Sequence, residues 1–236
     1  MNKFLILLFY FDRPKMVRNA LQSLIDSTYQ NYELAFIDDS EDSFSGFKVF
    51  NEFSVYPRKY IHTGDTEEQK LARGGSNFGK HANDAMEKSD ADICIMLCDD
   101  DFLKFDYLEN LNTYYESHPE VKYAYSHINL FNPIDEPYEQ VKERQVASPY
   151  LNHTSPLNPF CQVDSSQVSW RLPEGKERHI LFNYPQTRNL DASIYTSMYN
   201  TWGNCVFTGF IGEFKGWFPD QLGHRVNNDY KVMDIS

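Results

Sequence analysis

Three short apolar runs, each followed by acidic residues, constrain the fold of this chain more than any other feature. The runs are Phe4–Tyr10, Leu34–Ile37 and Ile93–Leu97, and the acidic residues behind them are Asp12, Asp38-Asp39 and Asp99-Asp100-Asp101. A strand with apolar residues on both faces is typical of a parallel sheet that is covered on both sides. The runs therefore predict central parallel strands whose carboxyl ends carry the acidic residues.

The segment between the first two runs predicts a helix. One helical face is formed by apolar residues at helical spacing, namely Val17, Ala20, Leu21, Leu24 and Ile25. Asp12 can cap this helix, with Pro14 in its first turn. Strand, helix and strand then form a crossover, the unit that builds parallel sheets.

Weaker patterns predict the remaining elements. They indicate helices around 47–53, after Gly74-Gly75-Ser76, over 106–117 and over 191–202, and strands near 60–61, over 121–126, and within 160–170 and 179–182. The rest of 40–73 is polar and irregular. Five prolines from Pro133 to Pro159 make the second half rich in loops. We therefore expect a single α/β domain over 1–236, divided into halves at 1–130 and 131–236.

Composition excludes several classes of protein. The net charge of -12 argues against a chain that mainly grips nucleic-acid phosphates or an anionic membrane. The apolar run at the start is too short to cross a bilayer, and Asp12-Arg13-Pro14 follows it where a signal peptide would have small residues. None of the four cysteines forms a C-x-x-C pair, which favours buried free thiols and a reducing compartment. We expect a cytoplasmic protein without a transmembrane segment and leave peripheral attachment to a membrane open.

The acidic run Asp99-Asp100-Asp101 is the strongest candidate for a ligand site. In open parallel sheets, ligands bind outside the carboxyl ends of the strands, where this run is expected. Three adjacent carboxylates repel each other, so a compensating cation is expected, and Mg²⁺ or Mn²⁺ prefers such oxygen ligands. The alternative is a solvated acidic turn that begins a helix at Phe102.

Two other kinds of phosphate chemistry fit less well. A phosphatase would place an Asp after the first strand, as Asp12 does loosely, and a nucleotidyltransferase would also use acidic residues at this edge. No phosphate-binding G-x-x-x-x-G-K-[ST] loop is present. The stretch Gly74–Lys80 resembles such a loop in composition only.

Several motifs in order resemble family 2 glycosyltransferases of the GT-A fold. They are Phe9–Pro14, Ala20–Leu24, Thr28–Glu33 and Ile37–Ser40, followed by Asn77–Ala85 and the acidic run. The resemblance covers about the first half of the chain. It implies a mostly parallel Rossmann-like sheet flanked by helices, with a donor half over 1–130 and a smaller, loop-rich acceptor half over 131–236.

The resemblance also implies which residues bind the nucleotide. Asp39 resembles the carboxylate that accepts hydrogen bonds from the base, and Asp38 is the weaker candidate beside it. Arg73 resembles a basic residue near the base or diphosphate. The other implied nucleotide-binding residues are Phe9, Phe11, Arg13, Asn77, Lys80 and Asp99.

The metal is expected on the acidic run. Many family members carry Asp at the position of Cys98 and a metal-binding Asp two residues later, which makes Asp100 the principal ligand. A D-x-D pattern would instead pair Asp99 with Asp101, so all three stay candidates for Mn²⁺ or Mg²⁺. Cys98 departs from the family pattern and leaves the number of ligands open.

An inverting transferase also needs a carboxylate that deprotonates the acceptor hydroxyl. The family places this base at the start of a late helix, which implies Asp191 here, with Asp164 as the poorer alternative. The alternative role for Asp191 is capping or charging the helix N-terminus. Lys215 or His224 could reach the diphosphate, and Trp170, Trp202 and Trp217 could stack on sugars or fill the core.

The prediction is thus a metal-dependent inverting transferase that moves a sugar from a nucleoside-diphosphate sugar to a hydroxyl acceptor such as a glycan. UDP is the default nucleotide by family frequency. A nucleotidyltransferase on the same fold and a non-catalytic nucleotide-sugar binding module remain as alternatives.

Overall fold

A computed structural model of the chain describes residues 1–53, 58–131, 138–142, 153–160, 162–174, 180–184 and 190–216. Within these ranges, eight strands form one sheet in the order β3-β2-β1-β4-β7-β6-β8-β5. The strands are β1 (Phe4–Tyr10), β2 (Tyr32–Asp38), β3 (Arg58–His62), β4 (Ile93–Cys98), β5 (Asp101–Leu103), β6 (Tyr123–Phe131), β7 (Val168–Arg171) and β8 (Val206–Gly216). The helices are α1 (Val17–Ile25), α2 (Ser43–Glu52), α3 (Glu67–Arg73), α4 (Phe78–Lys88), α5 (Tyr107–Ser117), α6 (Tyr138–Val141) and α7 (Leu190–Trp202), with a 3-10 turn η1 (Ser165–Gln167).

The three apolar runs are the parallel centre of the sheet, as predicted. β1 pairs in parallel with both β2 and β4, and all seven of its residues are buried. Its side chains alternate between two cores, with Ile6 and Leu8 facing one and Leu5 and Leu7 facing the other. This alternation explains why the run is apolar throughout.

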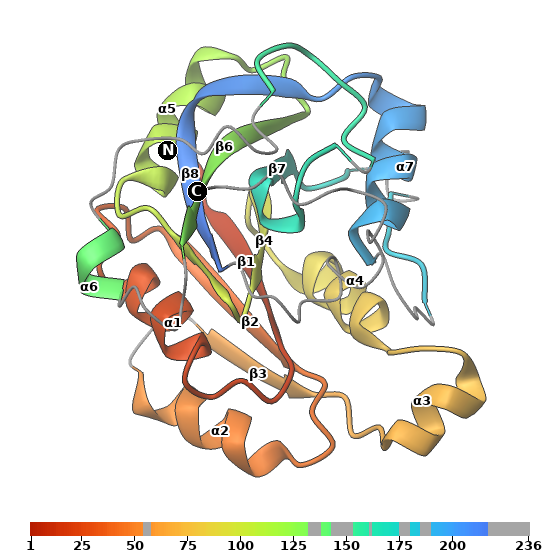
Figure 1. The fold of residues 1–236 in the computed structure, drawn as a ribbon. Coiled ribbons are helices and arrows are strands. Elements are labelled where there is room, and N and C mark those ends of the chain that lie inside the picture. Colours follow the sequence, from red (N-terminus) through yellow and green to blue (C-terminus); the bar gives the residue numbers. More distant parts are fainter. Residues whose placement is uncertain are drawn as a thin grey trace, which may run out of the picture.

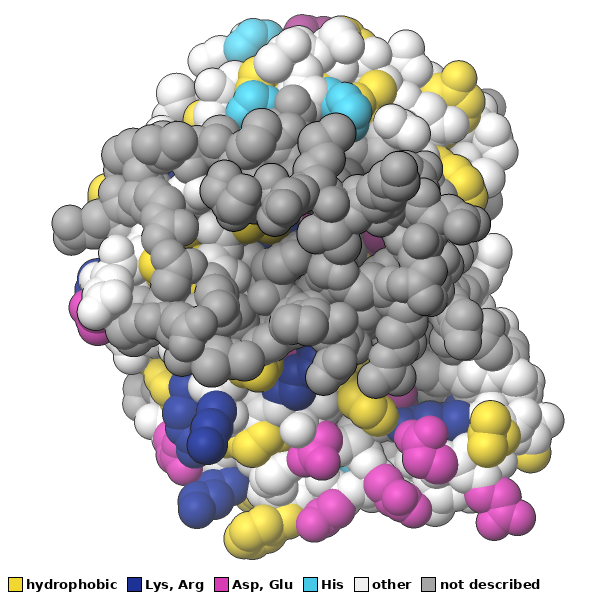
Figure 2. Space-filling model, viewed as in Figure 1, with side chains coloured by type: hydrophobic (Ala, Val, Ile, Leu, Met, Phe, Trp, Pro, Cys, Tyr) yellow, Lys and Arg dark blue, Asp and Glu magenta, His cyan; other side chains and the backbone are white. Residues whose placement is uncertain are grey.

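Helices cover both faces of the sheet (Figure 1). α1, α2 and α5 contribute to one core, while α4 and α7 contribute Ala82, Met86, Ile194 and Met198 to the other. None of the described helices is long and apolar enough to cross a membrane. Figure 2 shows that basic, acidic and hydrophobic side chains are interspersed over the lower part of the visible face, near α2 and α3.

The start of α1 differs from the prediction. The helix begins at Val17 with Met16 at its N-cap position, and no side chain caps it. Asp12 instead has a left-handed backbone with φ 49° and accepts a hydrogen bond from the Ser45 hydroxyl at 3.3 Å. Asp12 therefore belongs to the loop between β1 and α1, and its carboxylate contacts Ser45 of α2 instead of capping α1.

Several elements were not predicted, and α3 and β8 are the longest of them. α3 lies in the stretch that was expected to be irregular, and its N-terminus has a capping box formed by Thr66 and Gln69. β8 is an eleven-residue strand that pairs in parallel with β6 and antiparallel with β5. Leu181 and Phe182, by contrast, lie outside any strand.

The sheet changes direction beyond β4. β7 pairs antiparallel with β4 and β6, whereas the pairings among β1, β2, β3 and β4 are all parallel. The helix expected as an alternative at Phe102 is wrong, because 101–103 form β5 and α5 begins at Tyr107. We call β7, β6, β8 and β5 the antiparallel half, because the pairings β4–β7, β7–β6 and β8–β5 are antiparallel, although β6 and β8 are parallel. The acidic run therefore connects β4, the last strand of the parallel half, to β5 at the outer edge of the antiparallel half.

Candidate functional site

The acidic run is enclosed by the protein, which contradicts the alternative of a solvated turn. Asp99, Asp100 and Asp101 are only 3%, 8% and 0% exposed. Asp99 and Asp100 form the turn after β4, and Asp101 is the first residue of β5. A buried carboxylate is costly unless it is paired with a cation or with hydrogen-bond donors. The partners of each carboxylate therefore indicate whether it can bind a ligand or only stabilises the fold.

The loop after β1 supplies the partners of Asp99 and Asp100. The Phe11 backbone N–H donates to Asp99 at 2.8 Å, and one Arg13 nitrogen lies 2.8 Å from Asp99 and 3.2 Å from Asp100. Burial raises the pKa of Asp99 to about 7 against the lowering effect of Arg13. The structure thus brings together Phe11, Arg13, Asp99 and Asp100 from the ends of two neighbouring parallel strands. We call these four residues the open acidic pair site. The acidic pair is Asp99 and Asp100, and the site is open because the Arg13 side chain beside these buried carboxylates is 40% exposed.

Asp38 and Asp39, at the end of β2, have different environments. Asp38 is fully buried and accepts hydrogen bonds from the Ser40 backbone N–H at 2.9 Å and from the Tyr60 hydroxyl. Asp39 accepts the Thr63 hydroxyl at 2.7 Å and lies 3.2 Å from the Lys70 ammonium. Asp38 is therefore committed to the fold, whereas Asp39 lies beside a lysine that also contacts the ring of Phe11 at 4.9 Å.

The predicted residues around α3 and α4 gather on Asp65. Arg73 donates to both Asp65 oxygens, at 3.0 and 2.7 Å, and Asn77 donates to one of them at 3.1 Å. The Arg73 hydrogen bond is the main cause of the lowered pKa of Asp65. Lys80 is exposed on α4. The printed sequence gave no sign that Asp65 organises this corner.

Phe9 and Phe11 differ although both were expected to line a nucleoside pocket. The Phe9 ring is buried and packs against Phe78 and Phe182, with ring centres 5.2 and 6.3 Å apart. The Phe11 ring is 46% exposed. Only Phe11 therefore offers a ring face to a ligand.

Asp191 lies in the first turn of α7, as predicted. Burial raises its pKa to about 6, and the negative charge of Asp164 raises it further while Lys215 lowers it. Its carboxylate accepts a hydrogen bond from the Ala192 backbone N–H at 2.9 Å. A carboxylate with this pKa is deprotonated at neutral pH but basic enough to take up a proton, which suits a general base.

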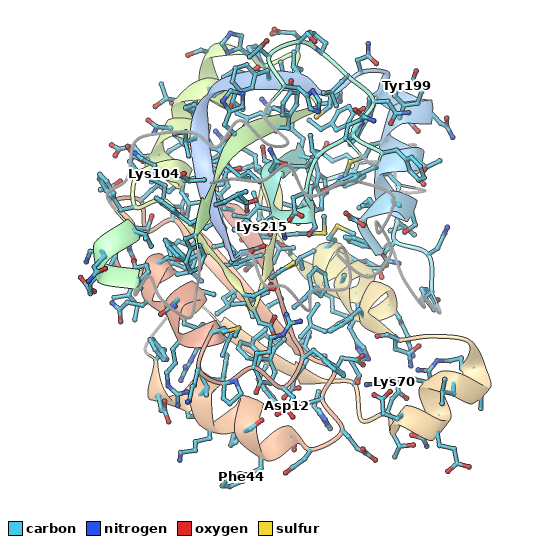
Figure 3. All side chains as sticks on the ribbon, viewed as in Figure 1. Asp12, Phe44, Lys70, Lys104, Tyr199 and Lys215 are labelled. Atoms are coloured by element: carbon cyan, nitrogen blue, oxygen red, sulfur yellow. The ribbon has the colours of Figure 1, made fainter. Side chains whose placement is uncertain are left out.

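Asp101 faces a different group from its two neighbours. Strand alternation puts Asp101 of β5 on the same face as its partner Lys215, and Glu213 lies two residues before Lys215 on that face. Asp164 and Ser166, around η1, cover this face. Lys215 lies 2.9 Å from Asp164 and 3.9 Å from Asp101, at the centre of the view in Figure 3.

We call Asp101, Asp164, Glu213 and Lys215 the enclosed cluster. Burial raises the pKa of Asp101 and of Glu213 well above the ordinary range. The Ser166 hydroxyl donates to Asp101 at 3.0 Å, and the Gly216 N–H donates to it at 3.2 Å. Glu213 was not predicted as a site residue, because the strand that places it was missed; an acid two residues from a lysine is the only signal the sequence carries.

Among the described residues, two groups of side chains could hold a metal ion. One consists of Cys98, Asp100 and Asp101, and the other of Asp101, Asp164 and Glu213; within each, the ligand atoms lie within 4.8 Å of one another. The Cys98 sulfur lies 3.3 Å from the Ser165 hydroxyl, and burial raises the pKa of its thiol.

The tryptophan and histidine candidates for binding the sugar or the diphosphate are not part of either acidic site in the described residues. Trp170 is fully buried in the core. Trp202 packs against the same core and lies 5.6 Å from the ring of Tyr123. Trp217 and His224 lie outside the described residues.

Comparison with known proteins bears on the fold. No protein-family model and no curated protein sequence matches the chain. Its structure is similar to the crystal structure of S. aureus TarS 1–349, with a TM-score of 0.62 and 17% identity over 91% of this chain and 60% of that one. The complex of TarS 1–349 with UDP-GlcNAc gives 0.67 and 14% over 93% and 60%, and the complex with UDP gives 0.63 and 16% over 92% and 61%.

The chain thus spans about three fifths of the length of these TarS structures. At such identities the similarity concerns the fold. The fold is a mixed α/β sheet of eight strands flanked by helices, of the GT-A-like type predicted from the sequence.

Proposed function

We propose that this chain is a glycosyltransferase of the family 2 type, which transfers a sugar from a nucleoside-diphosphate sugar, by default a UDP-sugar, to a hydroxyl acceptor such as a glycan. The observation that carries the proposal is the open acidic pair site, where Arg13, Asp99 and Asp100 meet at the carboxyl ends of β1 and β4. It lies at the edge where parallel sheets bind ligands. The similarity in fold to TarS, which has been crystallised with UDP-GlcNAc and with UDP, supports the same proposal.

In this proposal the nucleoside lies over the ends of β1 and β2. Asp39 accepts a hydrogen bond from the base, and the exposed ring of Phe11 supports the nucleoside. Asp99 faces the ribose. Arg13 holds Asp99 and Asp100 in place and supplies positive charge near the diphosphate. Arg73, Asn77 and Lys80 line the same side, with Arg73 and Asn77 fixed by Asp65.

The donor set fits a divalent metal ion. Asp99 and Asp100 are two buried carboxylates, and Arg13 is the cation that contacts both. The ligand atoms of Cys98, Asp100 and Asp101 lie close enough to share one ion. Asp100 would be the principal ligand of Mn²⁺ or Mg²⁺, with Asp99 and Asp101 nearby. When bound, the ion stabilises the negative charge of the departing nucleoside diphosphate.

The transfer itself uses Asp191 as general base. Asp191 removes the proton from the acceptor hydroxyl while that oxygen forms a bond to the anomeric carbon. The bond from the anomeric carbon to the phosphate oxygen breaks in the same step, so the configuration inverts. Residues 1–130 then form the donor half of a single domain and residues 131–236 the acceptor half.

Thermal unfolding with nucleotides tests this proposal. UDP with Mn²⁺ should raise the melting temperature of the wild-type protein, because ligand binding to the folded state stabilises it. Asp100→Ala should remove that increase, whereas Lys88→Met, a change at the exposed lysine that ends α4, should preserve most of it. An increase that survives Asp100→Ala unchanged contradicts the metal assignment.

Product analysis separates the alternatives. Incubation with UDP-sugar and Mn²⁺ should release UDP slowly even without an acceptor. Release of pyrophosphate from a nucleoside triphosphate would indicate a nucleotidyltransferase. Metal-dependent binding without turnover over many acceptors would indicate a binding module.

A further inference from the structure

We propose that the enclosed cluster binds a second divalent cation through the carboxylates of Asp101, Asp164 and Glu213, and that Asp101 borders both this ion and the donor metal. This inference is independent of the proposed function. It would place a structural ion between β5, β8 and the segment around η1, with oxygen ligands only.

The first observation is the geometry of the three carboxylates. Their ligand oxygens lie within 4.8 Å of one another. Oxygens bound to Ca²⁺ lie about 2.3–2.6 Å from the ion, so two of them on opposite sides are at most roughly 5 Å apart. The three side chains come from three separate segments of the chain, and the fold brings them within this limit.

The second observation is Glu213. Its side chain is 0% exposed, and neither carboxylate oxygen has a hydrogen-bond partner within normal distance in the part of the chain that the structure describes. The Ser166 hydroxyl lies close enough to lower the pKa of Glu213, but it donates its hydrogen bond to Asp101 at 3.0 Å. A buried carboxylate without partners is costly, and the oxygens of Asp101 and Asp164 beside it increase that cost.

The charges of the cluster indicate what is missing. Three carboxylates face one ammonium group, that of Lys215, which contacts Asp164 at 2.9 Å and Asp101 at 3.9 Å. With all three carboxylates ionised, as cation binding requires, two negative charges remain uncompensated within the cluster. One divalent cation balances them.

The chemistry of the ligands selects the ion. Carboxylate oxygens without nitrogen or sulfur favour hard cations. Mg²⁺ keeps several water molecules, which a site with two fully buried carboxylates does not favour, whereas Ca²⁺ accepts six or more protein oxygens in a flexible shell. Three carboxylates can supply up to six oxygens, so Ca²⁺ is the appropriate probe.

The main test measures Ca²⁺ binding to the nucleotide-free protein by calorimetry and thermal unfolding. Wild type should bind Ca²⁺, and its melting temperature should rise by roughly 5–10 °C at a hundredfold excess over the Kd. Glu213→Gln, which keeps the shape and removes the charge, should abolish this increase. Glu87→Gln, the same change at an exposed position of α4, should leave it intact.

Asp100→Asn separates this site from the proposed donor site. Ca²⁺ binding should persist in Asp100→Asn if the enclosed cluster is the site. Loss of binding in Asp100→Asn together with normal binding in Glu213→Gln would overturn the inference and leave the proposed function untouched. Failure of UDP and Mn²⁺ to bind would count against the proposed function only.

Lys215→Met provides a second test that does not depend on the folding of Glu213→Gln. Removing the ammonium group leaves three negative charges, so the variant should bind Ca²⁺ at least tenfold more tightly and regain stability when Ca²⁺ is added. A destabilised Lys215→Met protein whose stability and Ca²⁺ affinity do not respond would show that the lysine, with a proton on Glu213, is the whole compensation, and would overturn the proposal.

Discussion

The open acidic pair site and the enclosed cluster share the acidic run but have opposite surroundings. Asp99 and Asp100 face an arginine that is 40% exposed, at the end of the parallel half of the sheet. Asp101, next in the chain, faces a lysine whose side chain is only 13% exposed, in the antiparallel half. The change of direction between β4 and β5 causes the difference. Neighbouring carboxylates in one motif can therefore serve a ligand and the fold separately.

The largest expected effect is on the rate of sugar transfer and concerns Asp191, the proposed general base, whose pKa is influenced by Asp164 and Lys215 of the enclosed cluster. Asp191→Asn should lower the rate of sugar transfer by about 10²–10⁴-fold, because general base catalysis contributes about that factor. Donor binding, measured by the UDP-induced rise in melting temperature, should be unchanged. A variant that transfers sugar at the wild-type rate would remove Asp191 from the mechanism.

The next effect concerns the basic side chains of the two sites, Lys215 and Arg13, and what each contributes to the free energy of unfolding. Lys215→Met, measured without added Ca²⁺, should lower the free energy of unfolding by about 3–5 kcal/mol, because it leaves buried carboxylates without their partner. Chemical denaturation measures the change. If Lys215→Met lowers the free energy of unfolding by less than Arg13→Met does, Lys215 does not stabilise its carboxylates more than Arg13 stabilises Asp99 and Asp100.

Arg13→Met should have the smaller effect on stability. The exposed arginine allows water to reach Asp99 and Asp100 once it is removed, so we expect a loss of about 1–3 kcal/mol. Arg18→Met is the matched control, because Arg18 forms a surface ion pair with Glu52 at 2.6 Å and should contribute about 1 kcal/mol or less. Equal losses for the two arginines would show that the open acidic pair site has no special role in the fold.

The smallest expected effect is a shift in pH dependence. The pKa of Asp191 is raised to about 6, so kcat/KM should fall below pH 6 as the carboxylate takes up a proton and loses its ability to act as base. The charge of Asp164 contributes to this raised pKa. Asp164→Asn should therefore move the acid limb of the pH profile to lower pH. If the acid limb stays in place or moves to higher pH, the charge of Asp164 does not raise the pKa of the catalytic base.

The parallel half could be predicted from the sequence because its signals are local. Phe4–Tyr10 is apolar on both faces, which is typical of a strand between two helical layers. Asp39, Asp99 and Asp100 follow such strands directly, so their common edge could be inferred. What could not be inferred is that Arg13 contacts both Asp99 and Asp100, because this contact depends on how the loop after β1 folds and not on the residue types alone.

The antiparallel half was less predictable because its elements depend on distant partners. β8 contains glycines at 209, 212 and 216 and charged residues at 213 and 215, which do not resemble a buried strand. It is a strand because β6 and β5 pair with it on either side. Glu213 consequently entered the site only through the structure, and Asp164, expected only as the poorer alternative base, was not expected beside Asp101 and Lys215. The capping box of α3, by contrast, is legible in Thr66 and Gln69 and could have been found.

The pairing of β5 with β8 also has a consequence for how the molecule folds. The Asp101 carboxylate accepts a hydrogen bond from Gly216, 115 residues later in the chain. During synthesis the parallel strands β1, β2 and β4 can pair as soon as residue 98 is available, while Asp101 waits for nearly the whole of the described chain. Contacts this distant in sequence are slow to form because a long loop must close first. We therefore expect Asp99 and Asp100 to reach their final positions early and Asp101 to reach its final position late in folding.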